Sequence, residues 1–428
     1  MIKLPKKPEI LSPAGNFEKL RTAVYFGADA VYFAGKNFGM RAGADNFTLE
    51  EIEQACLYTR NKNKKAYLTV NTVPKSRDIA ELTDYLKQIN AMTYKPSAII
   101  CADIGVVMLI KKILPDVDIH ISTQANTQSW TACEAWAELG VKRIILSREL
   151  NFEDIHEIRD NLNAEIELEC FIHGAMCVSY SGRCLISNYL TSRDANRGAC
   201  TQPCRWKYYL TEEKRPDIFL EITERFDKGC TDSDSEGEPG TFLFSSKDLC
   251  MIEHIPDLVN SGIGSFKIEG RMKSAYYTAC ITNAYRIALD NFYENGAADP
   301  DLVQKLKLET ESVSRREYDT GYFYTTPASD AKICGNPDYI REKTYLGICM
   351  GYEQKTGLAV FEQRNKIVQG QKVQILSPGG VGRGILADVL LDENDEPICS
   401  APHPFQRFKL RVNFKIDKGD ILRSDEQI

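Results

Sequence analysis

Two repeating patterns of apolar and polar residues alternate along most of the chain. Short apolar runs recur, and between them lie segments with an apolar residue at every third or fourth position, as in Ile79–Ile89. The short runs predict strands, and the longer spacing predicts amphipathic helices. One helix start is marked by Thr48 and Glu51, which have the spacing of a capping box.

Eight strands are predicted, and helical segments separate them. This alternation is typical of parallel βαβ units. Eight such units predict a (β/α)8 barrel, closed by a long helix from Lys273 to about Glu294. An open, doubly wound sheet is the alternative fold. The predicted strands are Glu9–Leu11, Ala30–Ala34, Lys65–Asn71, Ser97–Ala102, Asp118–Ser122, Lys142–Ser147, Glu165–Ile172 and Gly264–Glu269.

The pattern changes in the last quarter of the chain, where short β-like runs are separated by Gly, Pro and Asn/Asp turns. These runs predict a small antiparallel β-barrel, which binds RNA or a partner protein or is a structural appendage. We therefore predict a barrel domain over residues 1–326 and a β domain over residues 327–428. Residues 211–240 interrupt the first domain as an excursion of mixed charge, with a possible small hairpin leading into Thr241–Ser245. The predicted C-terminal strands are Tyr345–Met350, Gly357–Glu362, Gln371–Leu376, Gly384–Leu391 and Phe408–Phe414.

Composition narrows the class of protein. At 428 residues the chain exceeds one ordinary core, and 43% hydrophobic with 26% charged residues is typical of a globular protein. No apolar run is long enough to span a membrane, and the N-terminus lacks the apolar core of a signal peptide. Fourteen cysteines without an export signal predict reduced thiols and a cytoplasmic location. A net charge of −7 argues against nonspecific nucleic-acid binding but leaves room for a local basic patch.

The segment Glu169–Lys207 is the richest in chemistry, because it holds five of the fourteen cysteines. Four of them, Cys177, Cys184, Cys200 and Cys204, have the spacing C-x6-C-x15-C-x3-C. Four soft thiolates suit an iron–sulfur cluster, with structural zinc as the alternative. Cys170 is expected in the core, and Cys250, at the start of a predicted helix, is the substitute ligand.

Polar residues at the ends of the predicted strands are candidates for a site at the mouth of the barrel. His173, Glu269 and Arg271 are the candidate catalytic residues. Candidate substrate-binding residues are Arg41, Arg148 and Lys267, and Arg143 is a further candidate for an acidic substrate. Lys267 and Glu269 share a strand face, so we expect them to pair. Neither H-E-x-x-H nor G-x-S-x-G is present, so neither motif supports a peptidase or hydrolase site.

Five longer stretches carry a more specific signal. The central one, with the signature HGAMCVSYSGRC, contains the first two of the four spaced cysteines. The stretches are EILSPAGN (Glu9–Asn16), GADAVYFAGKNFGMRA (Gly27–Ala42), ECFIHGAMCVSYSGRC (Glu169–Cys184), RGACTQPCRW (Arg197–Trp206) and SFKIEGRMKS (Ser265–Ser274).

At these stretches the chain resembles peptidase family U32, the collagenase-like proteases, and within it most closely the tRNA hydroxylation branch. The resemblance implies an enzyme that forms 5-hydroxyuridine at the wobble position of tRNA, with prephenate as hydroxyl source. It also implies a 4Fe–4S cluster on Cys177, Cys184, Cys200 and Cys204, with Cys250 as another possible fourth ligand. The implied partners are tRNA and the iron–sulfur assembly machinery. A peptidase and a non-catalytic, cluster-bearing RNA scaffold are the alternative functions.

Overall fold

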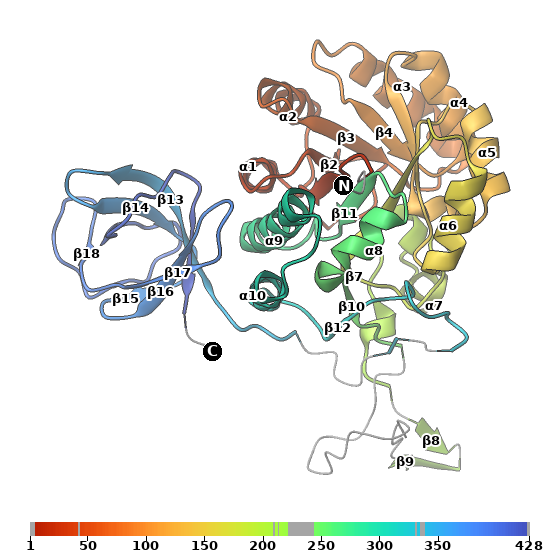
Figure 1. The fold of residues 1–428 in the computed structure, drawn as a ribbon. Coiled ribbons are helices and arrows are strands. Elements are labelled where there is room, and N and C mark those ends of the chain that lie inside the picture. The colour runs from red at the N-terminus through yellow and green to blue at the C-terminus, as the bar shows by residue number, and fades with distance from the viewer. Residues whose placement is uncertain are drawn as a thin grey trace.

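The computed structural model describes residues 5–41, 43–208, 210–212, 214–220, 244–329, 332–333 and 339–425. Eight parallel strands form a closed barrel, because β11 pairs with both β1 and β7 (Figure 1). This confirms the predicted (β/α)8 fold over the open sheet. The barrel strands are β1 (Glu9–Pro13), β2 (Ala30–Ala34), β3 (Lys65–Val70), β4 (Ala98–Cys101), β5 (Asp118–Ile121), β6 (Arg143–Ile145), β7 (Glu167–Ala175) and β11 (Ser265–Ile268).

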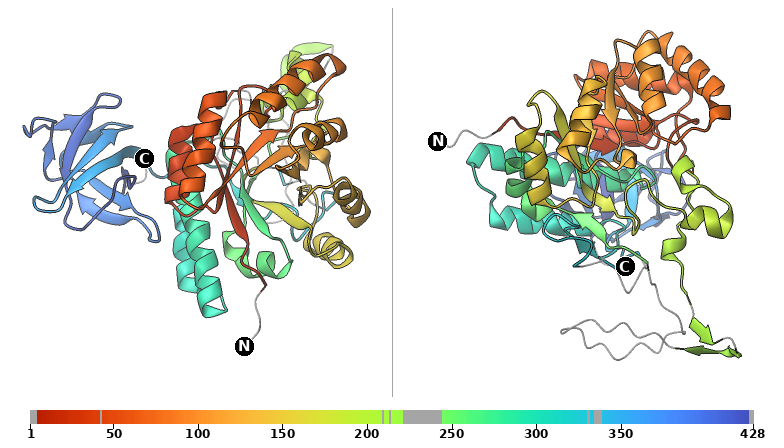
Figure 2. Two further views of the ribbon diagram at one scale, coloured as in Figure 1. Left: turned by 90° about the horizontal axis from the view of Figure 1, so that it is seen from above. Right: turned by 90° about the vertical axis from the view of Figure 1, so that its right-hand side faces the viewer.

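Helices surround the barrel, as Figure 2 shows. The predicted capping box is present: Thr48 Oγ1 accepts a hydrogen bond from Glu51 N, and Thr48 N donates to Glu51 Oε2. Asn16 caps the first helix through a bond from Lys19 N. The helices of this ring are α1 (Phe17–Tyr25), α2 (Leu49–Asn61), α3 (Ile79–Asn90), α4 (Ile104–Ile113), α5 (Trp130–Glu138), α6 (Phe152–Asn161), α8 (Ile255–Asn260), α9 (Ala275–Asn295) and α10 (Pro300–Glu311).

β7 continues beyond the barrel rim, and a short strand pairs with the extension. β10 (Asp248–Cys250) runs antiparallel to it, with Cys250 opposite His173, and β12 (Tyr318–Asp319) pairs with β10. The prediction that Cys250 begins a helix is therefore wrong. The extended end of β7 offers backbone groups that need partners, and this requirement outweighs local helix propensity.

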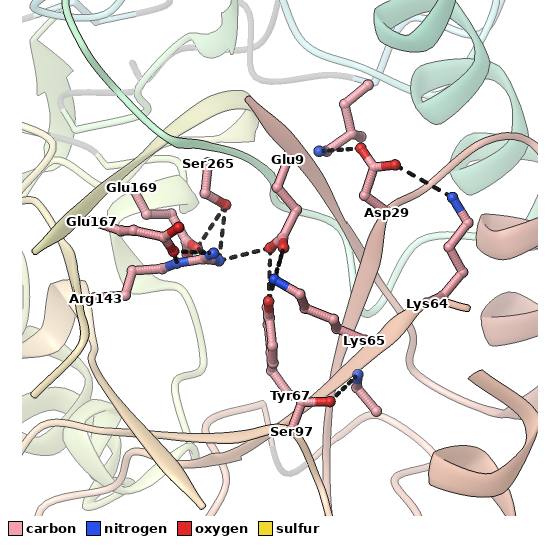
Figure 3. A network of polar contacts seen from close by, with 12 residues as sticks. Glu9, Asp29, Lys64, Lys65, Tyr67, Ser97, Arg143, Glu167, Glu169 and Ser265 are labelled. Atoms are coloured by element: carbon pink, nitrogen blue, oxygen red, sulfur yellow. Dashed lines mark hydrogen bonds and ion pairs between the residues drawn. The ribbon is translucent and has the colours of Figure 1, made fainter. Parts of the chain in front are cut away.

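The N-terminal end of the barrel interior is filled by a buried ion network (Figure 3). Arg143 Nη1 lies 2.7 Å from Glu9 Oε1 and 3.1 Å from Glu169 Oε2, and Arg143 Nη2 lies 2.6 Å from Glu167 Oε2. Ser265 Oγ donates to Glu169 at 2.9 Å. Arg143 therefore neutralises carboxylates at the end opposite the strand C-termini, and the structure does not place it at a substrate site.

The C-terminal region forms a curled antiparallel sheet, as predicted. Its core includes the stacked rings of Phe361 and Phe408. The strand β21 was not predicted, although it lies in the interior of the sheet between β13 and β16. The strands are β13 (Tyr345–Glu353), β14 (Leu358–Gln363), β16 (Lys372–Leu376), β17 (Arg383–Leu386), β18 (Leu390–Leu391), β20 (Arg407–Arg411) and β21 (Ile421–Ser424), with β15 (Ile367–Val368) paired to β19 (Ser400–Ala401).

This sheet packs beside α9 and α10 of the barrel (Figure 1). Arg423 Nη1 and Nη2 each lie 2.7 Å from a carboxylate oxygen of Glu309 in a fully buried contact. Tyr25 in α1 donates to Asp420 at 2.7 Å. A bidentate buried pair fixes the mutual orientation of the two partners more strictly than apolar contact does.

The remaining elements are α7 (Ile186–Thr191) and a hairpin of β8 (Leu210–Glu212) and β9 (Arg215–Leu220). This hairpin lies at the start of the 211–240 excursion, whereas the predicted hairpin leads into Thr241–Ser245, and residues 221–243 lie outside the described part of the chain. Within the described residues, no helix has the length and apolar character needed to cross a membrane.

Candidate functional site

A cavity of about 150 Å³ opens at the C-terminal ends of the barrel strands. Its walls come from the barrel, including Tyr32 in β2, Thr69 in β3, Phe171 in β7 and Lys267 in β11. Residues of the cysteine segment also line it. Because this end of a (β/α)8 barrel carries the active site in characterised enzymes of the fold, the cavity is the candidate site.

The four spaced cysteines all line this one cavity. Burial, and then the thiol of Cys177, raise the pKa of Cys204 to about 11; Cys200 and Cys184 add to the effect, and Arg205 opposes it. Cys170 is buried in the core, as expected. Cys250 does not line the cavity, and its sulfur lies 3.9 Å from Thr310 Oγ1. The structure thus brings Cys204, rather than Cys250, to the other three thiols.

No group of three or more His, Cys, Asp and Glu side chains in the described residues forms a ready-made site for a metal ion. The four thiols line one cavity. Ligands of a single zinc ion, bound at about 2.3 Å, must converge tightly. A cubane carries its irons at separate corners, so its four thiolates stand farther apart. Four thiols around one cavity are soft donors that suit either an iron–sulfur cluster or zinc.

Glu149 holds the cysteine loop against the barrel. Its carboxylate accepts hydrogen bonds from Ser181 N at 2.9 Å and Ser181 Oγ at 3.2 Å, and Ser147 Oγ also donates to it. Next to this serine, Gly182 has a φ of +72°, and a Cβ there would lie 2.1 Å from the carbonyl oxygen of Gln124. Only glycine allows this close approach, which positions the loop between Cys177 and Cys184.

Glu269 stands at the centre of a group of cations. Arg41 Nη2 lies 3.4 Å from its Oε1, and Tyr32 Oη donates to its Oε2 at 3.2 Å. Burial alone would raise the pKa of Glu269, but Arg41, Arg148 and Arg271 together lower it. Glu269 is therefore a carboxylate at neutral pH. Arg41 has a φ of +70°, in the left-handed region that non-glycine residues seldom adopt, so the surrounding structure imposes its position.

Arg148 has donor groups without a partner. Its Nη1 donates to the carbonyl oxygen of Ala175 at 2.8 Å, and its guanidinium carbon lies 4.3 Å from the centre of the Phe171 ring. Its Nε and Nη2 are buried and have no hydrogen-bond partner among the described residues. Because an unsatisfied buried donor costs about 1–3 kcal/mol, these N–H groups are open to an acceptor that enters the cavity.

Arg271 is buried beside the same carboxylate. Its Nη1 donates to Thr69 Oγ1 at 3.4 Å, a long bond, and burial lowers its pKa to about 10. It remains protonated at neutral pH. Across the whole cavity wall, five basic side chains face two acidic ones. The cavity therefore suits an anion.

Lys267 does not form the expected pair with Glu269. Its Nζ lies 2.8 Å from Glu169 Oε1 instead. The strand alternation correctly predicted that the lysine points into the barrel, but closure of the barrel brings β7 and its Glu169 alongside. Burial outweighs the charge of Glu169 and lowers the pKa of Lys267.

His173 does not line the cavity. Its ring is fully buried, with Nδ1 3.3 Å from Tyr285 Oη and Nε2 3.2 Å from Tyr318 Oη. The hydroxyl groups of Tyr318 and Tyr285 also donate to the backbone carbonyl oxygens of Thr310 and Ile172. Burial lowers the pKa of His173 to about 3, against a raising effect of Asp248. A proton shuttle near neutral pH would need a higher pKa.

Acid should therefore destabilise the protein through His173. The folded state holds the ring neutral while the unfolded chain protonates near pH 6.5, so lowering the pH favours unfolding. Between pH 7 and pH 5 the free energy of unfolding should fall by about 2 kcal/mol more in the parent than in His173→Gln, whose amide keeps a donor for Tyr318. Urea unfolding at the two pH values measures this difference. Equal losses in both proteins would contradict the assignment.

Exposed aromatic and basic residues lie in the cysteine segment beside the cavity. Tyr180 also lines the cavity and is 52% exposed, Tyr189 is 87% exposed and Trp206 is 43% exposed. Arg183 lines the cavity and is exposed as well. By contrast, Arg197 is paired with Asp78 at 2.5 Å. Aromatic faces next to arginines suit stacking of single-stranded bases.

Sequence reasoning missed Tyr32, Glu149 and Ser181. Tyr32 lies in a fully buried strand, and its polar tip was the available signal, since a buried tyrosine hydroxyl needs a partner. Glu149 follows Arg148 four residues beyond the end of β6, so its position near a strand end also marked it. No local signal marked Ser181, because its role depends on contact with a distant strand end.

Comparison with known proteins identifies the family. The profile "Peptidase family U32" matches residues 15–332, and "Peptidase family U32 C-terminal domain" matches residues 341–423. The chain is 36% identical over 425 residues to "tRNA hydroxylation protein P1" of Bacillus subtilis, covering 98% of this chain and 95% of the relative. It is 31% identical over 381 residues to "Collagenase" of Porphyromonas gingivalis, covering 86% of each chain.

A third relative is a 23S rRNA 5-hydroxycytidine synthase of Escherichia coli, 31% identical over 343 residues, which are 78% of this chain and 47% of that protein. The relatives therefore carry names from both RNA hydroxylation and proteolysis. The two family profiles between them cover the barrel except for β1, the cysteine segment and nearly all of the C-terminal sheet. This chain thus belongs to peptidase family U32.

Proposed function

We propose that this protein is an enzyme that hydroxylates carbon 5 of a pyrimidine in RNA. Its substrate is the uridine at the wobble position of tRNA, and prephenate is the hydroxyl source. Relatives named for tRNA hydroxylation and for 5-hydroxycytidine synthesis support the reaction class. The observation that carries the proposal within this molecule is the group of arginines around Glu269, which includes the unpartnered guanidinium nitrogens of Arg148.

The arginines supply a site for the carboxylates of prephenate. Arg148 offers buried N–H groups, and Arg271 offers a buried cation whose polar contact to Thr69 is long. A carboxylate that binds between them satisfies donors which the fold leaves open. Arg41 is held by Glu269, so it fixes the carboxylate of Glu269 rather than competing for the ligand. Glu269, ionised at neutral pH, is then positioned to accept a proton from the reacting pyrimidine.

Cys177, Cys184, Cys200 and Cys204 would hold a 4Fe–4S cluster above this anion site. Their common cavity and their electrostatic influence on Cys204 support this assignment. When bound, the cluster would either hold the cysteine loop in shape or activate the oxygen donor. In both cases Glu149 keeps Ser181, and with it the loop between the first two ligands, in place.

The RNA would approach across the exposed aromatic residues. Tyr180 belongs both to the cavity wall and to the exposed surface, so a base stacked on it lies at the cavity entrance. Enzymes that modify a base must take it out of its stack, and aromatic faces replace part of the lost stacking energy. Arg183 and Arg193, both exposed, are available for phosphate contacts.

A peptidase is the alternative function, because one relative is named a collagenase. The cavity wall includes Ser122, Ser179 and Ser181, but among the described residues no histidine lines it. The hydroxyl of Ser181 is bound to Glu149, in the contact that positions the loop. Without a histidine beside a free serine hydroxyl, the geometry favours RNA hydroxylation over Ser–His peptidase chemistry.

Mass spectrometry of tRNA nucleosides from a deletion strain tests the proposal. Loss of 5-hydroxyuridine and the nucleosides derived from it is expected, in a strain without a redundant paralogue, and restoration by the parent gene. Unchanged nucleosides would defeat the hydroxylation reaction. If the purified protein binds tRNA but never turns over with prephenate, the non-catalytic scaffold is the better description.

Arg148→Gln tests the anion site independently of tRNA binding. Loss of a charged hydrogen bond costs about 1.5–3 kcal/mol, so the KM for prephenate should rise about 10- to 100-fold. Binding of tRNA should not change. Arg148→Lys keeps the charge without the planar fork and should fall between parent and glutamine variant. An unchanged KM in Arg148→Gln would remove Arg148 from the site.

A further inference from the structure

Lys267 is a buried amine at the base of the cavity that the hydroxylation described above does not use. The residue is 4% exposed and lines the cavity. Its Nζ lies 4.6 Å from the centre of the Tyr32 ring and 5.3 Å from that of Phe171. Glu169 accepts one N–H at 2.8 Å, and the described residues provide no second acceptor within hydrogen-bond distance. The amine is therefore held from one side, with aromatic faces around it.

This environment favours a nucleophilic amine. Burial disfavours the ammonium form and lowers the pKa of Lys267, against the opposing effects of Glu169 and of the two ring faces, and such desolvation is the condition under which lysine acts as a nucleophile. Glu169 is a ready proton acceptor at 2.8 Å, and its other oxygen is held by Arg143 and Ser265. The arrangement is thus able to generate a neutral amine inside the barrel while the proton stays on a fixed carboxyl group.

The cavity also selects the kind of electrophile. Arg148 and Arg271 are cations that can bind a carboxylate. Both lower the pKa of Glu269, and Glu269 in turn has a raising effect on the pKa of Lys267. An α-keto carboxylate is a ligand that offers both a carboxylate to the arginines and a carbonyl carbon to the amine. Such a compound carries both groups on adjacent carbons.

We propose that Lys267 condenses with the keto group of an α-keto carboxylate bound in this cavity and forms a protonated imine. The ammonium gives one proton to Glu169, the amine attacks the keto carbon, and the carbon–oxygen bond breaks as water leaves with the returned proton. One ammonium and one ketone become one iminium and one water, so no further reactant is needed. Prephenate carries such a keto acid, and the identity of the natural ligand rests on the proposed function.

Formation of the imine would make the bound keto acid more electron-poor. A protonated imine withdraws electrons more strongly than the parent ketone, because it carries a full positive charge. The iminium would also fix the ligand covalently below the base that enters the cavity. Lys267 thereby acquires a catalytic role in handling the co-substrate, in addition to its ion pair with Glu169.

Reductive trapping tests the proposal on the full-length protein. Pyruvate or phenylpyruvate is added with cyanoborohydride near neutral pH, followed by intact-mass measurement and peptide mapping. One reduced adduct per chain is expected, located at Lys267, with loss of tryptic cleavage there. Lys267→Arg keeps a cation for Glu169 but forms no imine, so this adduct should vanish. Lys62→Arg, a change of an exposed lysine, should leave it intact.

The concentration dependence adds a second readout. Arg148→Gln should raise the pyruvate concentration for half-maximal trapping about 10- to 100-fold, through loss of a charged hydrogen bond. Lactate, which lacks the keto group, should compete without leaving an adduct. Absence of the Lys267 adduct with both keto acids, or equal labelling of Lys267 and surface lysines, overturns the proposal.

The test is independent of tRNA hydroxylation. An adduct at Lys267 in a protein that never hydroxylates tRNA would support the imine and reject the proposed function. Full hydroxylation by Lys267→Arg would reject the imine and leave the proposed function standing. Because the main result is obtained on the parent protein, poor folding of a variant does not prevent a decision.

Discussion

Cys204→Ser should lose most of its iron and sulfide and should form 5-hydroxyuridine at less than about a hundredth of the parent rate. Changes beside the ligands of a metal site already cost 10- to 100-fold, and loss of a ligand costs more. The expectation rests on position: Cys204 lines the cavity with Cys177, Cys184 and Cys200, and all three act on its pKa. Iron and sulfide analysis after anaerobic purification, with the nucleoside assay, measures both losses.

Cys250→Ser is the matched control. Cys250 is the other candidate for the fourth ligand, but it lies on β10 beside Thr310, and it does not line the cavity. Its replacement should leave iron content and turnover near parent levels. The reverse result, a colourless Cys250→Ser protein and an active Cys204→Ser protein, would assign the fourth ligand to Cys250. Stoichiometric zinc without iron in the parent would reject the cluster.

Arg143→Met should lower the free energy of unfolding by about 3–5 kcal/mol, the range for removing one partner of a buried ion pair. The loss should lie at the upper end, because Glu9, Glu167 and Glu169 all surround this one guanidinium (Figure 3). Arg143 is almost fully buried, so water does not replace the lost charge. Urea unfolding of parent and variant measures the difference.

Lys65→Met is the control for this network. Lys65 pairs with Glu9 at 3.1 Å but is itself largely exposed, so its removal should cost less than about 1 kcal/mol. Arg143→Met should also keep the parent KM for prephenate in the fraction that remains folded. A raised KM with unchanged stability would instead mean that Arg143 binds substrate, as the sequence first suggested.

Much of the barrel can be predicted from the sequence, because its strands and helix starts depend on residues that are close together in the chain. Strands buried on both faces are near-continuous apolar runs, such as Ala30–Ala34, and every predicted barrel strand overlaps an observed one. Helix starts are equally local, since Thr48 caps a helix through a residue three positions away. The short strand β10 escaped prediction because β7, far away in the chain, determines its conformation.

The residues of the candidate site show the same difference between local and long-range information. The spacing of Cys177, Cys184, Cys200 and Cys204 marked a set of soft ligands, and the strand ends marked Arg148, Glu269 and Arg271. These signals depend on residue type and on distance along the chain. They do not say which residue meets which partner across the barrel.

Pairing was decided by the closed sheet. Lys267 meets Glu169 instead of Glu269, and Arg41 reaches Glu269 across 228 residues of sequence. His173 is a further example of long-range packing. Its position at a strand end suggested a catalytic role, but β10 and α9 enclose its ring.

The sequence by itself determined the eight strands, the capped helices, the cysteine spacing and the strand-end charges, because short-range periodicity and residue chemistry encode them. Only the tertiary structure decided three further points. Cys204 lines the same cavity as the other three thiols, Arg143 lies at the N-terminal end of the barrel, and Arg148 keeps N–H groups without a partner among the described residues. The physical reason is that burial and ion pairing depend on strand register and barrel closure, which bring together groups far apart in the chain.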